Sequence, residues 1–339
     1  METAIGADKG ERRPGRDRGR LLKTYLERPE LAGLALLVLL VAFFQFRSDG
    51  VFLSFDNLRG VLGILPEVAP VAVGVTILMI AGEFDLSVGS VFALMPMAVA
   101  LLLNAGVPFA DAMALGLGVC ALVGLVNATV TLRFGIPSFI ATLGMLFVAR
   151  SLTVVISGGF PPLLPADVPS AIFTRFVGPF RLSMIWFAAI ALLLALVLGR
   201  TNFGNWIKAT GGNPEAARAM GIPVRAVKTA CFVLCSMPAG FAGTIQVFRL
   251  GSPLPSLGEG LELQAVAAAV IGGIALAGGV GTVLGGVLDP LLLRVIDNGL
   301  VLTQVDANWF KFAVGALLIG AVIANASLRR AARRMRVRT

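Results

Sequence analysis

The chain has 339 residues, of which 57% are hydrophobic and only 14% are charged. Soluble domains carry about 25% charged residues, so this composition excludes an ordinary soluble globular protein and indicates an integral membrane protein. Histidine is absent, which removes the commonest general base and metal ligand and argues against an enzyme within the membrane. The three cysteines lie in apolar segments and are predicted to be buried packing residues: Cys120, Cys231 and Cys235.

The net charge of +9 is concentrated at the two ends of the chain, in residues 1–27 and 328–339. A basic protein can bind nucleic acid. Here the positive charge flanks hydrophobic segments, so we expect it to anchor the chain at a lipid bilayer and expect no nucleic-acid partner. Both terminal segments are then basic cytoplasmic tails, the number of spans is even, and no cleavable signal peptide is expected. Residues 28–327 form the predicted transmembrane domain.

Because a helical span needs about 20 apolar residues, the chain has room for about ten. The predicted fold is therefore an all-α integral membrane protein. In chain order the apolar segments predict spans at 31–46, 61–80, 91–104, 110–132, 138–157, 182–199, 228–248, 263–277, 282–303 and 308–327. Counting from a cytoplasmic N-terminus places the loop at 200–227 inside and the loops at 158–181 and 249–262 outside.

Two patterns concern the shape of these helices. A polar run directly follows the second span, and the short apolar segments around it predict a broken helix near 81–90. Its backbone must line a cavity or be covered by protein. In addition, Asn127 precedes Gly144 by the same distance that Asn298 precedes Gly315. Corresponding spans are five apart, which predicts an inverted repeat of spans 2–5 and 7–10. Chance similarity between apolar segments is the alternative.

Polar residues inside the spans are candidates for a solute pathway, because an ionisable group near the bilayer centre costs about 2.5–3.5 kcal/mol. We single out Asp85, Ser87, Asn127 and Asn298 as polar groups near a translocated solute. Asp85 can instead cap a half-helix, and the two roles are compatible.

Further charges in these segments have either a structural or a functional role: Glu83, Asp289, Arg294 and Asp297. Arg294 and Asp297 are three residues apart on one helix and can pair. An ion-coupled secondary transporter or channel that uses such carboxylates is the alternative function.

The loop at 200–227 contains a polar segment with the signals of a short helix at 214–220. Asn213 is a good N-cap and Pro214 suits the first helical position. Gly221 can end the helix in the left-handed conformation. The exposed face would carry Glu215 and Arg218, spaced to interact. This helix is either an ordinary capped loop or a docking helix for a soluble partner. The chain has no phosphate-binding loop, so it carries no ATPase of its own.

Four motifs, in order, resemble those of the ribose-type permease subunits of bacterial ABC sugar importers. They are Asp85-Leu-Ser-Val-Gly-Ser90, Ile136-Pro-Ser-Phe-Ile-Ala-Thr-Leu-Gly144, Gly211-Gly-Asn-Pro-Glu-Ala-Ala-Arg218 with Gly221-Ile222, and Ala267-Ala-Ala-Val-Ile-Gly-Gly273 with Gly278-Gly-Val-Gly-Thr282. The resemblance covers about residues 31–325. One departure is Gly82-Glu83-Phe84, where many members have Gly-Gly-Ile.

The resemblance implies a ten-span permease of the inner membrane that imports a monosaccharide or a similar small polyol, with amino acids or nucleosides as alternatives. The implied partners are a cytoplasmic ABC ATPase that binds ATP and Mg, a periplasmic solute-binding protein that docks on the two outer loops, and a second permease subunit, identical or homologous. No cofactor is implied in this chain. The residues that match the family's ATPase-coupling loop are Gly212, Asn213, Pro214, Glu215, Ala216, Ala217, Arg218 and Gly221.

Overall fold

The computed structural model describes residues 30–306 and 308–336. The predicted tail at 1–27 lies outside these residues, as does the end of the predicted tail at 328–339. The described chain is mostly helical, with a single two-stranded hairpin of β1 and β2 in which Phe176 pairs with Arg181.

The bounds of the elements are, in chain order, α2 Glu30–Arg47, α3 Phe55–Ile64, the 3-10 helix η1 Leu65–Glu67, α4 Ala69–Ile80, α5 Val88–Asn104, α6 Phe109–Phe134, α7 Ser138–Ile156, α8 Ala171–Thr174, β1 Phe176–Val177, β2 Phe180–Arg181, α9 Ser183–Arg200, α10 Asn202–Gly212, α11 Pro214–Ala219, α12 Val224–Leu250, α13 Leu261–Ile271, α14 Val283–Leu302 and α15 Trp309–Arg336.

Four of the described helices are long and apolar enough to cross a membrane, namely α6, α7, α9 and α12. Helix α3 continues through η1 into α4 with a bend of 47° between the two parts. They give a fifth span if they cross the membrane as one unit. The other predicted spans fall on shorter apolar segments or on α14, which contains Asp289, Arg294 and Asp297. The helical membrane architecture is confirmed, whereas the count of ten spans stays a prediction.

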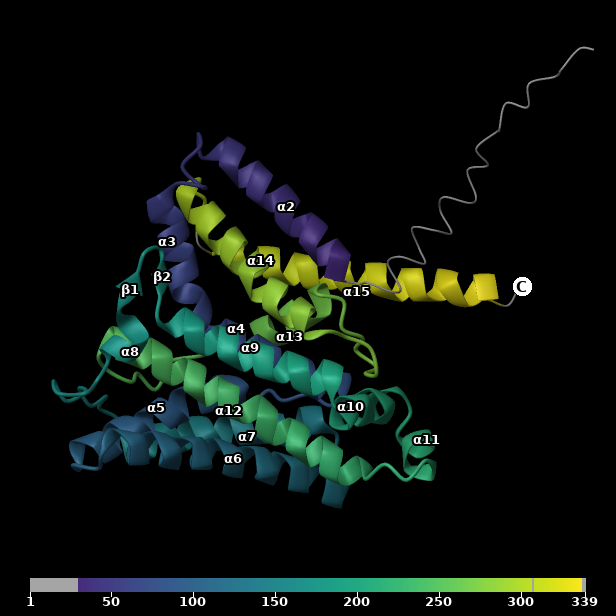
Figure 1. The fold of residues 1–339 in the computed structure, drawn as a ribbon, viewed down its shortest axis with the longest axis horizontal. Helices are drawn as coiled ribbons and strands as arrows, with labels where there is room; N and C mark the ends of the chain where they lie inside the picture. The colour runs from purple at the N-terminus through teal and green to yellow at the C-terminus, as the bar shows by residue number, and fades with distance from the viewer. Residues whose placement is uncertain (1–29, 307, 337–339) are drawn as a thin grey trace, which may run out of the picture.

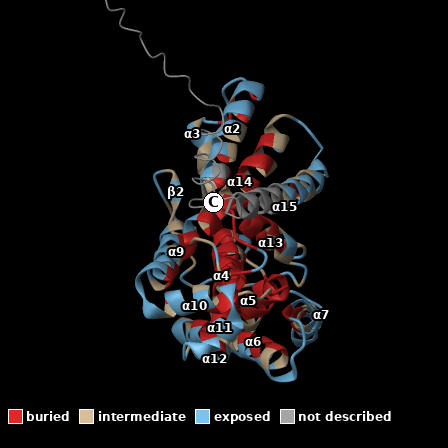
Figure 2. Ribbon diagram, turned by 90° about the vertical axis from the view of Figure 1, so that its right-hand side faces the viewer, coloured by how far each residue is buried: buried red, intermediate tan, exposed pale blue. Residues whose placement is uncertain are grey.

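Helix α4 lies at the centre of the arrangement. It packs against α9, α12, α13 and α14. In Figure 1 α4 lies behind α9, with α5, α6 and α7 on one side of α9 and α12 and with α2, α3 and α14 on the other. All residues of α4 are apolar or small, apart from Thr76, and all are buried. Figure 2 shows this buried core continuing from α4 into α5, α13 and α14. The apolar core therefore surrounds the segment that precedes the predicted helix break.

Close contact between α12 and its neighbours depends on small residues, as is common in membrane helix pairs. A Cβ added to Gly74 of α4 would lie 3.0 Å from the carbonyl oxygen of Cys235. A Cβ added to Gly243 of α12 would collide with the carbonyl oxygen of Phe92 on α5. Both contacts join backbone to backbone, so α4 and α5 are held directly against α12.

Two helix breaks interrupt the core. The first separates α4 from α5 at residues 81–87, inside the region 81–90 where the sequence predicts a broken helix. The second separates α13 from α14 at 272–282 and begins earlier than the predicted end of that span at 277. Gly273 has a positive φ of 88°, a conformation that ends a helix and that other residues rarely adopt. The predicted inverted repeat stays a prediction.

Candidate functional site

The predicted helix in the 200–227 loop is present as α11. The side-chain oxygen of Asn213 accepts hydrogen bonds from the backbone N–H groups of Glu215 (3.1 Å) and Ala216 (3.0 Å). Pro214 occupies the first turn, and Gly221 follows the helix with a positive φ of 81°. These are the capping roles that the sequence predicts. The helix ends at Ala219, one residue before the predicted end, because Met220 already leaves the helical conformation.

Most of the predicted coupling residues face outward. Ala217 is the buried exception, whereas the exposed members are Gly212, Asn213, Pro214, Glu215, Ala216, Arg218 and Gly221. Glu215 and Arg218 both lie on the exposed face, as predicted, and neither forms an ion pair within the described residues. Sequence reasoning missed Met220, which is 82% exposed at the end of α11. A flexible, exposed methionine of this kind suits contact with another protein.

Three of the four predicted pathway residues meet in one buried cluster. One carboxylate oxygen of Asp85 accepts hydrogen bonds from the backbone N–H (2.8 Å) and the hydroxyl (2.6 Å) of Ser87. The side-chain amide of Asn127 on α6 donates to the Ser87 hydroxyl at 2.9 Å and to the Asp85 carboxylate at 3.3 Å. All three side chains are at most 1% exposed. The cluster joins the connection between α4 and α5 to α6. The N-cap residue of α5 is Ser87, and no side chain caps the helix, so Asp85 orients the cap residue but does not cap the half-helix itself.

Hydroxyl groups of α7 complete the hydrogen bonding of the same break. The backbone N–H of Phe84 donates to the hydroxyl of Ser138 (3.1 Å), and that of Leu86 donates to Thr142 (3.0 Å). Ser138 and Thr142 lie one turn apart on α7. Protein groups thus satisfy the backbone that the break removes from the helical ladder. The Ser-x-x-x-Thr spacing at the start of an apolar helix was the available signal for these two residues.

Asn298 lies outside this cluster. Its side-chain amide on α14 exchanges two hydrogen bonds of 2.9 Å with Asn57 on α3. This reciprocal amide pair joins the two helices, and it uses one donor and one acceptor site of each side chain.

The remaining intramembrane charges divide into paired and unpaired groups. Lys228 of α12 forms an ion pair with Glu83 in the first break, and Arg294 pairs with Asp297 at 2.9 Å. The predicted pair within α14 is therefore confirmed. Asp289 is buried, and neither of its carboxylate oxygens has a hydrogen-bond partner of normal geometry among the described residues. Within the described residues, no group of three His, Cys, Asp or Glu side chains could hold a metal ion.

Arginine side chains form two sets of contacts at the opposite end of α12 from α11, and their partners were not predicted from the sequence. Arg249 binds the fully buried carboxylate of Glu67 with two hydrogen bonds of 2.6 and 2.8 Å, and Arg181 reaches it at 3.3 Å. A guanidinium nitrogen of Arg150 binds the carbonyl oxygen of Leu257 at 2.6 Å and so holds the 251–260 loop. The signal for the first cluster was Glu67 itself, since an ionisable residue in an apolar run requires a partner.

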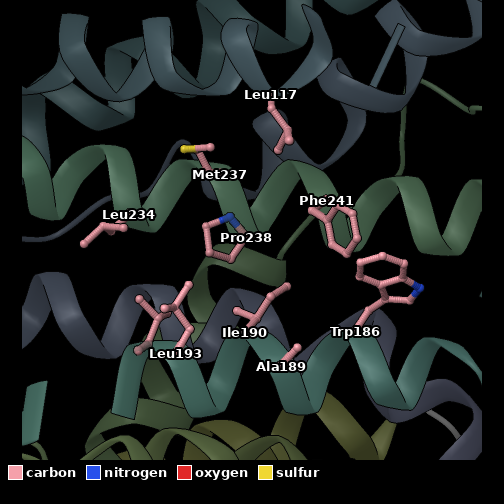
Figure 3. Close-up of a pocket in the computed structure, with 10 residues that line it drawn as sticks. Leu117, Trp186, Ala189, Ile190, Leu193, Leu234, Met237, Pro238 and Phe241 are labelled. Carbon is pink, nitrogen blue, oxygen red and sulfur yellow. The ribbon is translucent and has the colours of Figure 1, made fainter. Parts of the chain in front are cut away.

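The molecule also has an apolar cavity of about 360 Å³ between α6, α9 and α12. Figure 3 shows its lining side chains, which come from these three helices. The cavity is lined by Leu117, Trp186, Ala189, Ile190, Leu193, Leu194, Leu234, Met237, Pro238 and Phe241. None of the predicted polar residues lines it, and a polar solute would find almost no hydrogen-bond partners there. It is therefore not the candidate solute site.

Comparison with known proteins identifies the family. Residues 58–322 match the family described as "Branched-chain amino acid transport system / permease component". The chain is 34% identical over 306 residues to the autoinducer 2 import system permease protein LsrC of Yersinia pseudotuberculosis serotype O:1b (strain IP 31758), which covers 89% of this chain and 86% of that protein. Identity and coverage are the same for the protein of that name from Yersinia pestis. No solved structure matches the chain significantly.

The family match includes the first helix break, the Asp85 cluster and all of α11. More than half of the chain is matched, and the relatives agree over nearly their whole length. The chain therefore belongs to this family of permease components, the membrane-spanning transport subunits of ABC import systems.

Proposed function

We propose that this permease transmits the action of a cytoplasmic ATPase subunit to the membrane through α11, which inserts into a cleft of that partner. The observation that carries the proposal is the capped helix Pro214–Ala219 with its outward-facing Glu215, Arg218 and Met220. A short capped helix that presents two exposed charges and an exposed methionine supports docking on a soluble protein. ATP and Mg belong to the partner, and this chain requires no cofactor.

The proposed topology has ten spans and places both termini in the cytoplasm. The spans are α2, α3 with α4, α5, α6, α7, α9, α12, α13 with the segment after it, α14 and α15. Figure 1 supports this order, since α10 and α11 lie at one end of α9 and α12, and the β1–β2 hairpin lies at the other end. The positive-inside rule agrees, because Lys208, Arg218 and Arg225 then lie on the cytoplasmic side.

A periplasmic solute-binding protein docks on the loops 158–181 and 249–262. The two loops act as one surface, because Leu164 donates a backbone hydrogen bond to Gly251 (3.0 Å) and Ser252 donates to the carbonyl of Pro162 (3.0 Å). A second permease subunit, identical or homologous, completes the pathway. The solute passes between the two subunits, near the Asp85 cluster.

The solute is a small polar molecule, either a monosaccharide or a similar polyol. Autoinducer 2 is the first candidate to test, because the relatives are named for its import. The affinity of the solute resides mainly in the soluble binding protein, so the pathway holds it weakly.

Reconstituted uptake tests the function. Proteoliposomes that contain this chain, its ATPase and a loaded binding protein should accumulate labelled solute only with internal ATP, and a proton uncoupler should have no effect. An ion-coupled secondary transporter predicts the opposite result, in which uptake continues without the ATPase and stops with the uncoupler. That result would contradict the proposal.

A further inference from the structure

Three segments that are far apart in the sequence meet beside the coupling helix with their backbones in contact. They are the end of α10 at Gly211, the start of the first break at Gly82, and the turn Gly278–Gly279 in the second break. The N–H of Gly279 donates a hydrogen bond of 2.8 Å to the carbonyl of Ile80, the last residue of α4. We call this contact the glycine junction, formed by Ile80, Gly82, Gly211, Gly278 and Gly279. In Figure 1 the loop between α13 and α14 reaches toward α10 at this end of the molecule.

The junction has no room for a side chain at Gly211 or at Gly278. A Cβ on Gly211 would collide with the carbonyl oxygen of Ile80 and lie 2.7 Å from the backbone nitrogen of Gly279. A Cβ on Gly278 would lie 2.8 Å from both the carbonyl oxygen of Gly211 and the Cα of Gly82. Backbone contacts have no side-chain rotamers that could absorb a displacement. A shift of α10 is therefore passed directly to both breaks.

The other side of the coupling helix is connected to the same break. Lys228, in the second turn of α12, forms its ion pair with Glu83, next to Gly82. Both side chains are only 12% exposed, so water screens this pair little. We call residues 211–228, which include α11, the coupling segment. Gly211 at its start and Lys228 at its end both contact residues 82–83 of the first break.

From residue 83 the connection continues into the membrane domain. The next residues carry the hydrogen bonds to Ser138 and Thr142 on α7, and Asp85 binds Ser87 and Asn127. Each link is a hydrogen bond or a backbone contact within a buried region. The first break is therefore held between the coupling segment on one side and helices α6 and α7 on the other.

We propose that the glycine junction makes the coupling segment and the two helix breaks move as one body, and that Gly211 is a positioning residue for coupling ATP hydrolysis to solute movement. The inference rests on the proposed function, and it names how the force that α11 receives enters the membrane domain. Packed interfaces switch between discrete arrangements and do not deform continuously, which suits such a device.

The first test replaces Gly211 by alanine in the full complex with ATPase and binding protein. The variant should still bind the ATPase and hydrolyse ATP, but the solute transported per ATP should fall at least about fivefold, the lower end of typical coupling effects between sites. Gly199→Ala is the matched control, because a Cβ at that position on α9 meets no atom within 4 Å. It should transport as the wild type does. An assembled Gly211→Ala complex with the wild-type ratio would overturn the proposal.

The second test needs no variant and remains decisive if Gly211→Ala does not fold. Hydrogen exchange of the Gly279 amide is measured in the wild-type complex at rest and after trapping with vanadate. Movement as one body keeps the Gly279 to Ile80 hydrogen bond, so protection should be equal in both states. Loss of protection in the trapped state would overturn the proposal that the glycine junction moves as one body, and it would leave the proposed function intact. Failure of the proposed function is separate, since it would appear as wild-type uptake that does not depend on ATP.

Discussion

At the scale of single residues, Glu83 shows how a buried charge is explained by its partner. In the sequence it is a departure from the expected Gly-Gly-Ile pattern and a candidate for ion coupling. In the structure its carboxylate pairs with Lys228 at the start of α12. A mostly buried ion pair gives little net stability, but removing one partner leaves an uncompensated charge. Glu83 is thus bound to Lys228, which favours a structural role.

The first prediction concerns this pair. Lys228→Met should destabilise the protein by about 3–5 kcal/mol, because Glu83 would remain buried and unpaired. Thermal unfolding in detergent should show the loss, and the charge swap Glu83→Lys with Lys228→Glu should recover part of it. Arg294→Met is the control, since the Arg294–Asp297 pair is more exposed, at 26% and 38%, and should cost at most about 1 kcal/mol. Equal unfolding temperatures for Lys228→Met and the wild type would refute the assignment.

At the scale of elements, α11 and the first break were predictable because their signals are local. Asn213, Pro214 and Gly221 mark the ends of α11 within nine residues of sequence, and short-range capping determines such helices. Helix α10 and the glycine junction were not predictable. They depend on contacts of Gly211 with residues near positions 80 and 279, and nothing in the local sequence pattern specifies which glycines will meet.

The second prediction concerns the hydroxyl groups that support the first break. Thr142→Val should cost about 1–3 kcal/mol, because the backbone N–H of Leu86, in a buried site, would lose the Thr142 hydroxyl that accepts its hydrogen bond among the described residues. Thr153→Val is the matched control, since Thr153 is equally buried on α7 but bonds only the Ala149 carbonyl of its own helix. Chemical unfolding of the two variants gives the comparison. Equal stabilities would show that Thr142 does not support the break.

The third prediction concerns the exposed face of α11. The double substitution Glu215→Ala and Arg218→Ala should uncouple uptake from ATP hydrolysis, because the charges that we propose meet the ATPase are removed while the caps of the helix remain. Both positions are exposed, so the stability of the permease should change by at most about 0.5 kcal/mol. Uptake and ATP hydrolysis are measured in the same proteoliposomes. Normal coupled uptake would exclude this face as the contact with the ATPase.

At the scale of the whole molecule, composition alone correctly predicts a helical membrane protein, yet it overestimates the regularity of the spans. Apolar runs of similar length appear as long helices, such as α6, and as short helices with breaks, such as α13. The difference arises because Gly273, with its positive φ, interrupts the helix, and other chain segments cover the backbone of the same break at Gly278 and Gly279. Hydrophobicity reports that a segment is buried or in lipid, but it does not report whether the segment is continuous.

The arrangement of the spans leads to a prediction about sidedness. After Met220 the chain makes a short turn and then forms α12, which leads directly to the 251–260 loop. Helix α12 is long enough to cross the membrane once. Cysteines introduced at Met220 and at Ser256, which are both exposed, must therefore lie on opposite sides. The three native cysteines are buried and should stay unlabelled in the folded protein.

A membrane-impermeant maleimide applied to intact cells should label Ser256→Cys through the outer membrane pores and leave Met220→Cys unlabelled. Inverted membrane vesicles should give the reverse pattern, because their cytoplasmic face is exposed. The unmodified chain controls for the native cysteines and should react only after denaturation. Labelling of both positions from one side would contradict a single crossing by α12, and a reversed pattern would place α11 outside, where no ATPase could reach it. The orientation of α12 thus decides whether α11 can serve as the coupling helix.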